Sequence, residues 1–349
     1  MSAKTNPGNF FEDFRLGQTL VHATPRTLSE GDVALYTALY GPRFALQSAD
    51  SFARSLGLPR APIDDLLVFH TVFGKSVPDI SLNAVANLGY AEGRFLKPVY
   101  PGATLSAVSE VIGLKENSNR QTGVVYVRTD GFDDTGDKVL SYVRWVMVRK
   151  RDPNAAVPEA HVPKTAAAVS PESLIAPAAG FARFDCAASG SPHLWDDYEP
   201  GEKIDHVDGM TVEESDHMLA TRLYQNTAKV HFNQFSEAKG RFGRRLIYGG
   251  HVISLARALS FNGLANAVSI AAINGGRHVN PLFAGDTVFA WSEVLDKAEL
   301  RKDCGALRLR LVATKNLPCA EFPDKNGEGA FPENVILDFD YWAILPRTP

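Results

Sequence analysis

Apolar and polar residues alternate strictly in one stretch near the C-terminus, where arginines separate Leu307, Leu309 and Leu311. A period of two places every second side chain on the same face of a β-strand. Four further stretches are rich in β-branched and aromatic residues, and they also predict strands: 124–127, 139–148, 287–294 and 335–345. The chain therefore contains two runs of strands, one in each half.

Helices are predicted ahead of each run of strands, at residues 27–40, 66–73, 211–224 and 252–264. The motifs Thr27-x-x-Glu30 and Thr211-x-x-Glu214 have the spacing of a capping box, which opens a helix. The stretches 66–73 and 252–264 are more apolar, and the second is long enough for a buried helix. Each half thus has helices first and antiparallel strands afterwards, which is an α+β order.

The sequence repeats itself at an offset of 184 residues. Residues 11–40 align without a gap on residues 195–224, and the matches include Asp13 on Asp197, Gly17 on Gly201, His22 on His206 and Leu39-Tyr40 on Leu223-Tyr224. Residues 94–104 align on residues 277–287 at an offset of 183, so one residue was lost between them. A period this long is a duplication of a whole domain, because solenoid units span about 20 to 50 residues.

A segment rich in alanine and proline separates the two copies. Residues 153–182 contain 10 Ala and 5 Pro in 30 positions and show no apolar periodicity, as linkers do. We assign an N-terminal domain to residues 1–152, a linker to 153–190 and a C-terminal domain to 191–349. A short helix on the surface stays open as an alternative for part of the linker, because alanine favours helices.

Composition and charge exclude several classes of protein. Apolar residues make up 45% of the 349 positions and charged residues 22%, as in ordinary globular proteins. The formal net charge of −4 offers no excess of cations for nucleic acid. No apolar run approaches the roughly 18 residues of a membrane span, and the first residues lack the apolar stretch of a signal peptide. Three cysteines, at positions 186, 304 and 319, have no zinc spacing and fit reduced thiols. We expect a cytoplasmic protein without metal, nucleic-acid or membrane partners.

A motif in the C-terminal half resembles that of the MaoC-like hydratases. In that family G-D-x-N-P-x-H is followed by H-G-M at the start of a central helix. This chain reads Gln225-Asn-Thr-Ala-Lys-Val-His231 and then Tyr248-Gly-Gly-His251. Asn226 stands at the Asp position, His231 at the His position and Gly250 at the Gly position. The resemblance implies a tandem, or double, hot-dog fold, in which an antiparallel sheet wraps around a central helix in each half.

These residues suit the addition of water to a double bond that is conjugated to a thioester. The unperturbed pKa of histidine lies near 6.5, so His231 can take or give a proton at neutral pH. The backbone N–H of Gly250, at the start of a helix, can hold the oxygen on which charge develops. Tyr248 and Gly249 adjoin it and are expected to contact substrate. The chemistry needs no cofactor, since coenzyme A is part of the substrate.

Two departures from the family pattern matter. Asn226 can hydrogen-bond a water molecule but cannot exchange a proton with it, so Asp64, Asp65 or the substrate's own carboxylate stays open as a replacement. In the N-terminal half the offset of 184 places Pro42, Gln47 and Leu66 opposite the three catalytic candidates. That half has lost the catalytic set, which predicts one active site in each chain.

Longer strings resemble the mesaconyl-CoA hydratases over nearly the whole chain: 10–17, 32–41, 84–90 and 223–233. This resemblance implies reversible hydration of mesaconyl-CoA to β-methylmalyl-CoA, and it is compatible with a homo-oligomer of double hot-dog subunits. The free carboxylate of such a substrate calls for a cation, for which we predict Lys229 first and Arg43 second. An acyl-CoA thioesterase and a non-catalytic acyl-CoA-binding protein stay open as alternatives.

Overall fold

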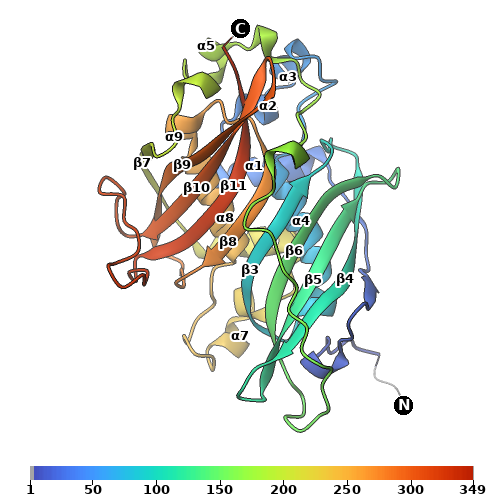
Figure 1. Cartoon of the computed structure of the whole chain (residues 1–349). Coiled ribbons are helices and arrows are strands. Elements are labelled where there is room, and N and C mark those ends of the chain that lie inside the picture. Colours follow the sequence, from blue (N-terminus) through green and yellow to red (C-terminus); the bar gives the residue numbers. More distant parts are fainter. Residues whose placement is uncertain (1–3, 349) are drawn as a thin grey trace.

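The two halves of the chain build one continuous antiparallel sheet (Figure 1). The computed structural model describes residues 4–348. The strand order in this 11-stranded sheet is β1-β4-β5-β6-β3-β8-β11-β10-β9-β7, with β2 paired to β4. The strands are β1 (Thr19–Val21), β2 (Arg26–Thr27), β3 (Ala84–Phe95), β4 (Thr104–Glu116), β5 (Thr122–Phe132), β6 (Lys138–Arg149), β7 (Lys203–Thr211), β8 (Ser269–His278), β9 (Thr287–Arg301), β10 (Cys304–Lys315) and β11 (Val335–Pro346).

Helices cover one face of this sheet, and α4 and α8 are the long central helix of each half. The α-helices are α1 (Glu30–Tyr40), α2 (Ala45–Ser48), α3 (Asp50–Ser55), α4 (Asp65–Ser76), α5 (Cys186–Ser189), α6 (Glu214–Leu223), α7 (Gln234–Glu237), α8 (Gly249–Leu259) and α9 (Phe261–Leu264). The tighter or wider turns are η1 (Phe11–Asp13), η2 (Val77–Ser81), η3 (Pro171–Ser173), η4 (Phe181–Arg183), η5 (Trp195–Asp197) and η6 (Lys229–His231). Among residues 4–348, none of the helices combines the length and the apolar character that a bilayer crossing demands.

Strands β3 and β8 join the halves, and their pairing follows the sequence repeat. Tyr90 pairs with Gly276, and Gly93 pairs with Ile273. At the offset of 183, Tyr90 corresponds to Ile273 and Gly93 to Gly276, so each pair turns into the other when the halves are exchanged. The chain is therefore a double hot-dog with a pseudo-twofold axis through this junction, as the sequence predicts.

The capping prediction is wrong by two residues at each first helix. The hydroxyls of Thr27 and Thr104 are hydrogen-bonded at 2.7 Å, as are those of Thr211 and Thr287, so both predicted caps are strand residues. In the N-terminal half the helix begins after Ser29, whose Oγ accepts from the N–H of the third helical residue. In the C-terminal half it begins after Glu213.

Two other predictions need correction. The apolar stretch 252–264 is not one helix: α8 begins three residues earlier and ends at Leu259. In the following α9, Asn262 and Gly263 leave the helical region of backbone dihedrals. Strands β3 and β8 are not among the predicted strands, because at the junction they contain glycines in place of β-branched residues. A Cβ added to Gly93 would lie 2.9 Å from the side chain of Ile273 on the neighbouring strand.

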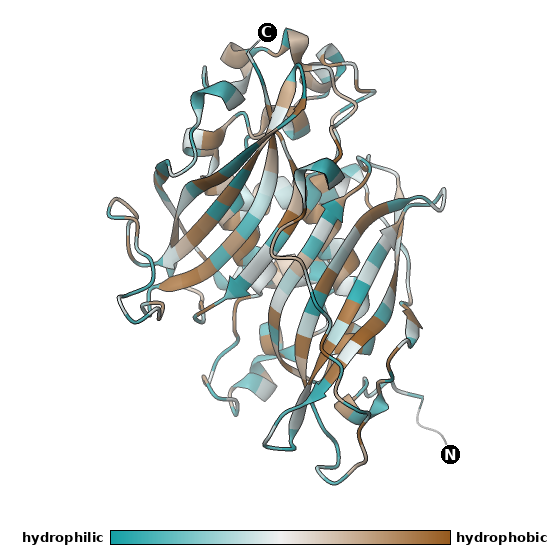
Figure 2. Ribbon diagram, in the orientation of Figure 1, coloured by the Kyte–Doolittle hydropathy of each residue, from teal (hydrophilic) through white to brown (hydrophobic). Residues whose placement is uncertain are grey.

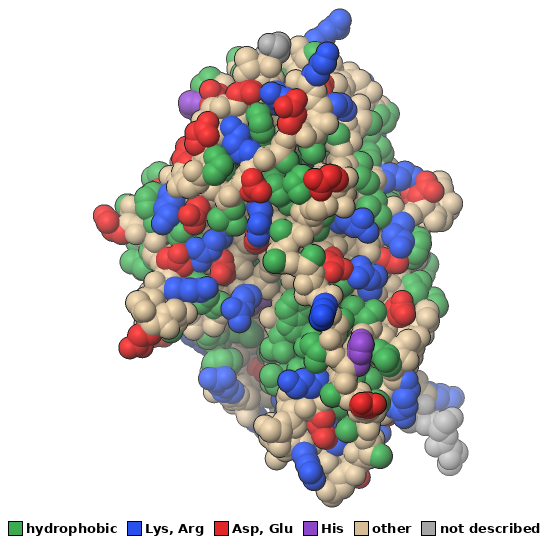
Figure 3. Space-filling view, viewed as in Figure 1, with side chains coloured by type: hydrophobic (Ala, Val, Ile, Leu, Met, Phe, Trp, Pro, Cys, Tyr) green, Lys and Arg blue, Asp and Glu red, His purple; other side chains and the backbone are tan. Residues whose placement is uncertain are grey.

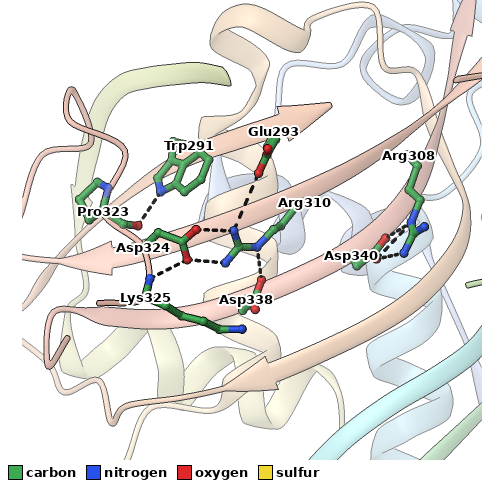
Figure 4. Close-up of polar contacts among 9 residues, drawn as sticks. All are labelled: Trp291, Glu293, Arg308, Arg310, Pro323, Asp324, Lys325, Asp338 and Asp340. Atoms are coloured by element: carbon green, nitrogen blue, oxygen red, sulfur yellow. Dashed lines mark hydrogen bonds and ion pairs between the residues drawn. The ribbon is translucent and has the colours of Figure 1, made fainter. Parts of the chain in front are cut away.

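The alternating stretch on β10 separates core from surface (Figure 2). Its leucines are fully buried, whereas Arg308 and Arg310 lie on the opposite face of the sheet. There Arg308 binds Asp340 at 2.6 Å, and Arg310 binds Asp324 at 2.6 Å and Asp338 at 2.7 Å (Figure 4). Acidic and basic side chains are interspersed over this face of the molecule, so it is no single-sign patch (Figure 3).

The segment that we interpret as the linker lies on the outer face of the sheet (Figure 1). His161 forms an isolated bridge with Leu114 on β4. Further on, the N–H of Val169 donates to the side chain of Asn274 on β8, and Trp342 on β11 donates to the Val169 carbonyl. These contacts lead the chain from the N-terminal half across the junction to the C-terminal half.

Candidate active site

His231 ends the short turn η6 and has one ring nitrogen committed to the protein. Nδ1 lies 2.9 Å from the carbonyl oxygen of Leu246. Because a carbonyl only accepts, Nδ1 carries the proton and Nε2 keeps a lone pair. Burial lowers the pKa of His231 to about 4, so the imidazole is neutral at pH 7. A neutral, oriented imidazole is ready to accept a proton through Nε2.

Asn226 lies five residues before this histidine in a buried turn. Its side-chain oxygen accepts from the N–H of Ala228 at 3.0 Å, which fixes the start of the loop. The loop packs on α4 of the other half: a Cβ added to Gly74 would lie 1.9 Å from the carbonyl oxygen of Tyr224. The family motif is thus held in place by the N-terminal half, with an amide where the family has a carboxylate.

The start of α8 presents backbone N–H groups with no partner. Tyr248 is the N-cap residue and its side chain makes no capping hydrogen bond, and the N–H groups of Gly249 and Gly250 bind no acceptor within residues 4–348. First-turn N–H groups point outward at the positive end of the helix dipole. Such a pair of donors is suited to an oxygen that gains negative charge.

Glycine is required at both positions because the surroundings are close. A Cβ on Gly249 would lie 2.4 Å from Nε2 of His278. A Cβ on Gly250 would lie 2.4 Å from the ring of Tyr248 and 2.6 Å from that of His70. Any larger residue would displace the rings that surround the start of the helix.

The structure brings four of the predicted residues together and adds a fifth. The ring centroids of His231 and Tyr248 are 5.4 Å apart, and Gly249 and Gly250 follow directly on α8. His278 at the end of β8 is the addition, because its ring lies against Gly249. Burial lowers the pKa of His278 to about 4, and the neighbouring His231 contributes to the same shift. The repeat could have indicated this residue, because the N-terminal half, which lacks the catalytic set, has Phe95 at the corresponding position.

The N-terminal half supplies a wall of the same site. The ring of Phe73 on α4 lies 5.9 Å from that of Tyr248. The hydroxyl of Tyr90 on β3 lies 3.5 Å from Nε2 of His278. The candidate site therefore lies where the start of α8 meets the end of α4, between the two halves.

The two predicted cations are both on the surface. Lys229 is exposed and makes no ion pair with any described residue. Arg43 is also exposed, and its guanidinium stacks on Phe261 at 4.4 Å, beyond the opposite end of α8.

Asp64 and Asp65 mark the equivalent place in the N-terminal half, at the start of α4. Asp64 caps that helix through the N–H of Leu66, and Asp65 accepts from the N–H of Ile270 at 2.7 Å. Burial raises the pKa of Asp65 to about 7. They lie at the opposite end of α4 from the residues that contact the Asn226 loop, so they are not placed to replace its missing carboxylate. A small cavity in this half is lined by Asp64 together with Pro42 and Gln47, the counterparts of Asn226 and His231.

This combination of a duplicated hot-dog sheet, a histidine and a glycine-led helix at the junction defines the MaoC-like double hot-dog hydratases. A solved MaoC domain protein dehydratase from Chloroflexus aurantiacus superposes with a TM-score of 0.98 at 65% identity, covering 100% of both chains. A Mycobacterium tuberculosis protein with a double hotdog fold superposes with a TM-score of 0.75 at 26% identity, covering 97% of this chain and 99% of that one.

Within that class the chain belongs to the mesaconyl-CoA hydratase family, whose sequence profile matches residues 2–318. The β-methylmalyl-CoA dehydratase of Chloroflexus aurantiacus is 66% identical over 99% of both chains. The mesaconyl-CoA hydratase of Cereibacter sphaeroides is 63% identical over 99% of this chain and 100% of its own.

Proposed function

We propose that this hydro-lyase adds water reversibly to mesaconyl-CoA, giving β-methylmalyl-CoA. The observation that carries the proposal is the free Nε2 of His231 beside the unpartnered N–H groups that begin α8. Two relatives of more than 60% identity are named for the two directions of this reaction. The names of these relatives identify the acyl group, and the arrangement of the site supports the addition of water.

The reaction needs one proton acceptor and one site for a developing negative charge. The thioester oxygen binds at the N–H of Gly250, which draws electrons from the double bond. His231 takes a proton from water through Nε2 while the water oxygen bonds to the β-carbon, and the side chain of Asn226 positions that water. His231 then returns the proton to the α-carbon, so atoms and charges balance. Reversal of these steps is the dehydration, and neither direction requires a cofactor.

A basic segment between the catalytic histidine and α8 suits the phosphates of coenzyme A. Lys239, Arg241 and Arg244 are exposed, and each lies over an aromatic ring, at 5.3, 5.1 and 3.9 Å from the centroid. None of the three forms an ion pair with a described carboxylate, whereas Arg245 binds Glu214. Cations that lack a partner are available for an anionic ligand.

One incubation separates the three classes of function. Hydration of mesaconyl-CoA removes the ultraviolet absorbance of the conjugated double bond and releases no thiol. Release of free coenzyme A would indicate the thioesterase, and binding without either change would indicate a non-catalytic protein. Incubation of β-methylmalyl-CoA should bring the same absorbance back, and heat-inactivated protein is the control.

A further inference from the structure

Arg144 on β6 is a buried cation that the site described so far does not use. Its relative exposure is 0%. Nη2 donates to the hydroxyl of Ser76 at 2.8 Å, and both Nη1 and Nη2 donate to the hydroxyl of Ser81 at 3.4 Å. The guanidinium stacks on Phe73 at 4.2 Å. Nε is buried with no hydrogen-bond partner, and no carboxylate within residues 4–348 forms an ion pair with the guanidinium. A charge taken out of water costs several kcal/mol unless an anion accompanies it.

This guanidinium lies beside the candidate active site. Arg144 is directly opposite Tyr90 in the β3–β6 ladder, so the two side chains share the face of the sheet that meets α4. The Tyr90 hydroxyl approaches His278, and the Phe73 ring under the guanidinium approaches Tyr248. Phe73 and Tyr90 therefore each neighbour both Arg144 and the candidate active site.

The equivalent pocket of the other half contrasts with this arrangement. Because Tyr90 pairs with Arg144 and the equivalent Ile273 pairs with Tyr341, the counterpart of Arg144 is a tyrosine. The cation of that pocket is Arg257 instead, which is 5% exposed and stands at the repeat position of Phe73.

Two acids lie near that second cation, although its guanidinium donates to the Ser260 hydroxyl and the Ala267 carbonyl and forms no ion pair within residues 4–348. Asp64 and Asp65 lie close enough for the charge of Arg257 to lower their pKa values, against the larger effect of burial, which raises them. One pocket thus contains a buried arginine within electrostatic reach of two acids, whereas the charged or titratable neighbours of Arg144 within residues 4–348 are tyrosines.

We propose that Arg144 binds the free carboxylate of the acyl-CoA substrate. This inference rests on the proposed function and adds the residue that selects dicarboxylic acyl groups. The mesaconyl group has its thioester at one end of the double bond and its carboxylate at the other. With the thioester oxygen at Gly250, the carboxylate extends toward the end of α4, where the guanidinium offers a planar fork for two parallel hydrogen bonds. Lys229 and Arg43, both exposed, are not needed for this contact.

The test compares substrates with and without the second carboxylate. Arg144→Met keeps the length of the side chain and removes the charge. For mesaconyl-CoA kcat/KM should fall by about 10²- to 10³-fold, the loss typical of a broken buried ion pair. Crotonyl-CoA, which lacks the carboxylate, should be hydrated as well as by the wild type. Arg257→Met is the matched control, because it removes a buried arginine over an aromatic ring and should leave the ratio of the two substrates unchanged.

Equal losses on both substrates in the Arg144 variant would overturn the proposal. If Arg144→Met does not fold, Arg144→Lys replaces it; the substrate ratio should still fall, because an ammonium cannot make the bidentate contact, and an unchanged ratio would count against us. Binding of succinyl-CoA and butyryl-CoA by calorimetry separates this inference from the proposed function, since neither compound is hydrated. Loss of a preference for succinyl-CoA in the variant supports carboxylate binding even if mesaconyl-CoA is not turned over, whereas a wild type without that preference refutes it.

Discussion

The phenol oxygens of Tyr40 and Tyr224 lie 2.8 Å apart, and the two residues occupy the same position in the duplicated sequence. Only residues on a twofold axis can meet their own counterparts. His70 and Ser254, also 184 positions apart, are hydrogen-bonded at 3.0 Å in the same way. The pseudo-twofold axis therefore passes through a buried polar chain between the central helices, beside the candidate site.

Removal of either phenol oxygen should weaken the contact between the halves. Tyr224→Phe should lower the free energy of unfolding by about 1 kcal/mol, the usual contribution of one hydrogen bond. Tyr40→Phe should lower it further, because the Tyr40 hydroxyl is also hydrogen-bonded to Nδ1 of His251 at 3.1 Å. The double variant should lose less than the sum, because both changes remove the same bond. Denaturant unfolding of the four proteins measures the coupling, and strictly additive losses would mean that the bond contributes nothing.

His231→Ala should lower kcat by about 10² to 10⁴, the range for removal of a general acid or base. His206→Gln is the control, because both ring nitrogens of His206 are already bound, to the Asn262 carbonyl and the Ser292 hydroxyl. That variant should lose stability and keep its turnover. A folded His231→Ala protein that keeps the parent's kcat would show that another group is the catalytic base, and His278 would be the first residue to test.

Asn226→Asp restores the carboxylate of the family motif. A carboxylate oxygen can accept from Ala228 as the amide oxygen does, so the variant should fold and hydrate mesaconyl-CoA at a rate comparable to that of the parent. A pH–rate profile should gain a new acidic limb from the added group. A folded but inactive variant would show that a neutral amide is required beside a substrate that already carries a negative charge.

Gly250→Ala should lower both stability and turnover, since the added methyl group would meet Tyr248 and His70 at less than 3 Å. Overpacking of this kind costs about 1 to 3 kcal/mol. Gly327→Ala places the same group in open space and should change neither property. Thermal unfolding measures the effect on stability, and the absorbance assay measures the effect on turnover. A Gly250→Ala enzyme with unchanged turnover would show that the N–H groups at the start of α8 do not bind the thioester oxygen.

Acid should destabilise the fold well before the carboxylates are protonated. Burial lowers the pKa of His70 and His251 to about 3, and that of His206, His231 and His278 to about 4. The unfolded chain takes up these protons near pH 6.5, so stability is complete above that pH and is lost as the pH falls toward 4, by about 1.4 kcal/mol per histidine and pH unit.

Two carboxyl groups act in the opposite direction. The raised pKa values of Asp64 and Asp65 make folding more favourable as the pH falls, for Asp65 from about 7 downward, but they are two groups against five. Denaturant unfolding at pH 7.5, 6.0 and 5.0 measures the sum, and a flat profile would show that the imidazoles are hydrated in the native state.

The repeat and the strand patterns were sufficient to predict a duplicated α+β domain, and the resemblance to the MaoC-like hydratases added the double hot-dog fold. The caps were misplaced because Thr27 and Ser29 are both good capping residues, and only the sheet decides that the first is a strand residue. His231 and Gly250 are predicted from their places in the family motif. Arg144 was missed within an apolar strand, although the buried neighbours Tyr142 and Val146 at alternate positions already indicate that it points inward.

Each position in one pocket is encoded by a different codon from the equivalent position in the other pocket, because one chain contains both halves. In a homodimer of identical subunits, any substitution enters both pockets at once, and a residue that improves one must be tolerated in the other. Here Arg144 and Tyr341 are different codons, as are Phe73 and Arg257. Selection could therefore place acids near the buried arginine of one pocket and leave the buried arginine of the other without them, which identical subunits could not do.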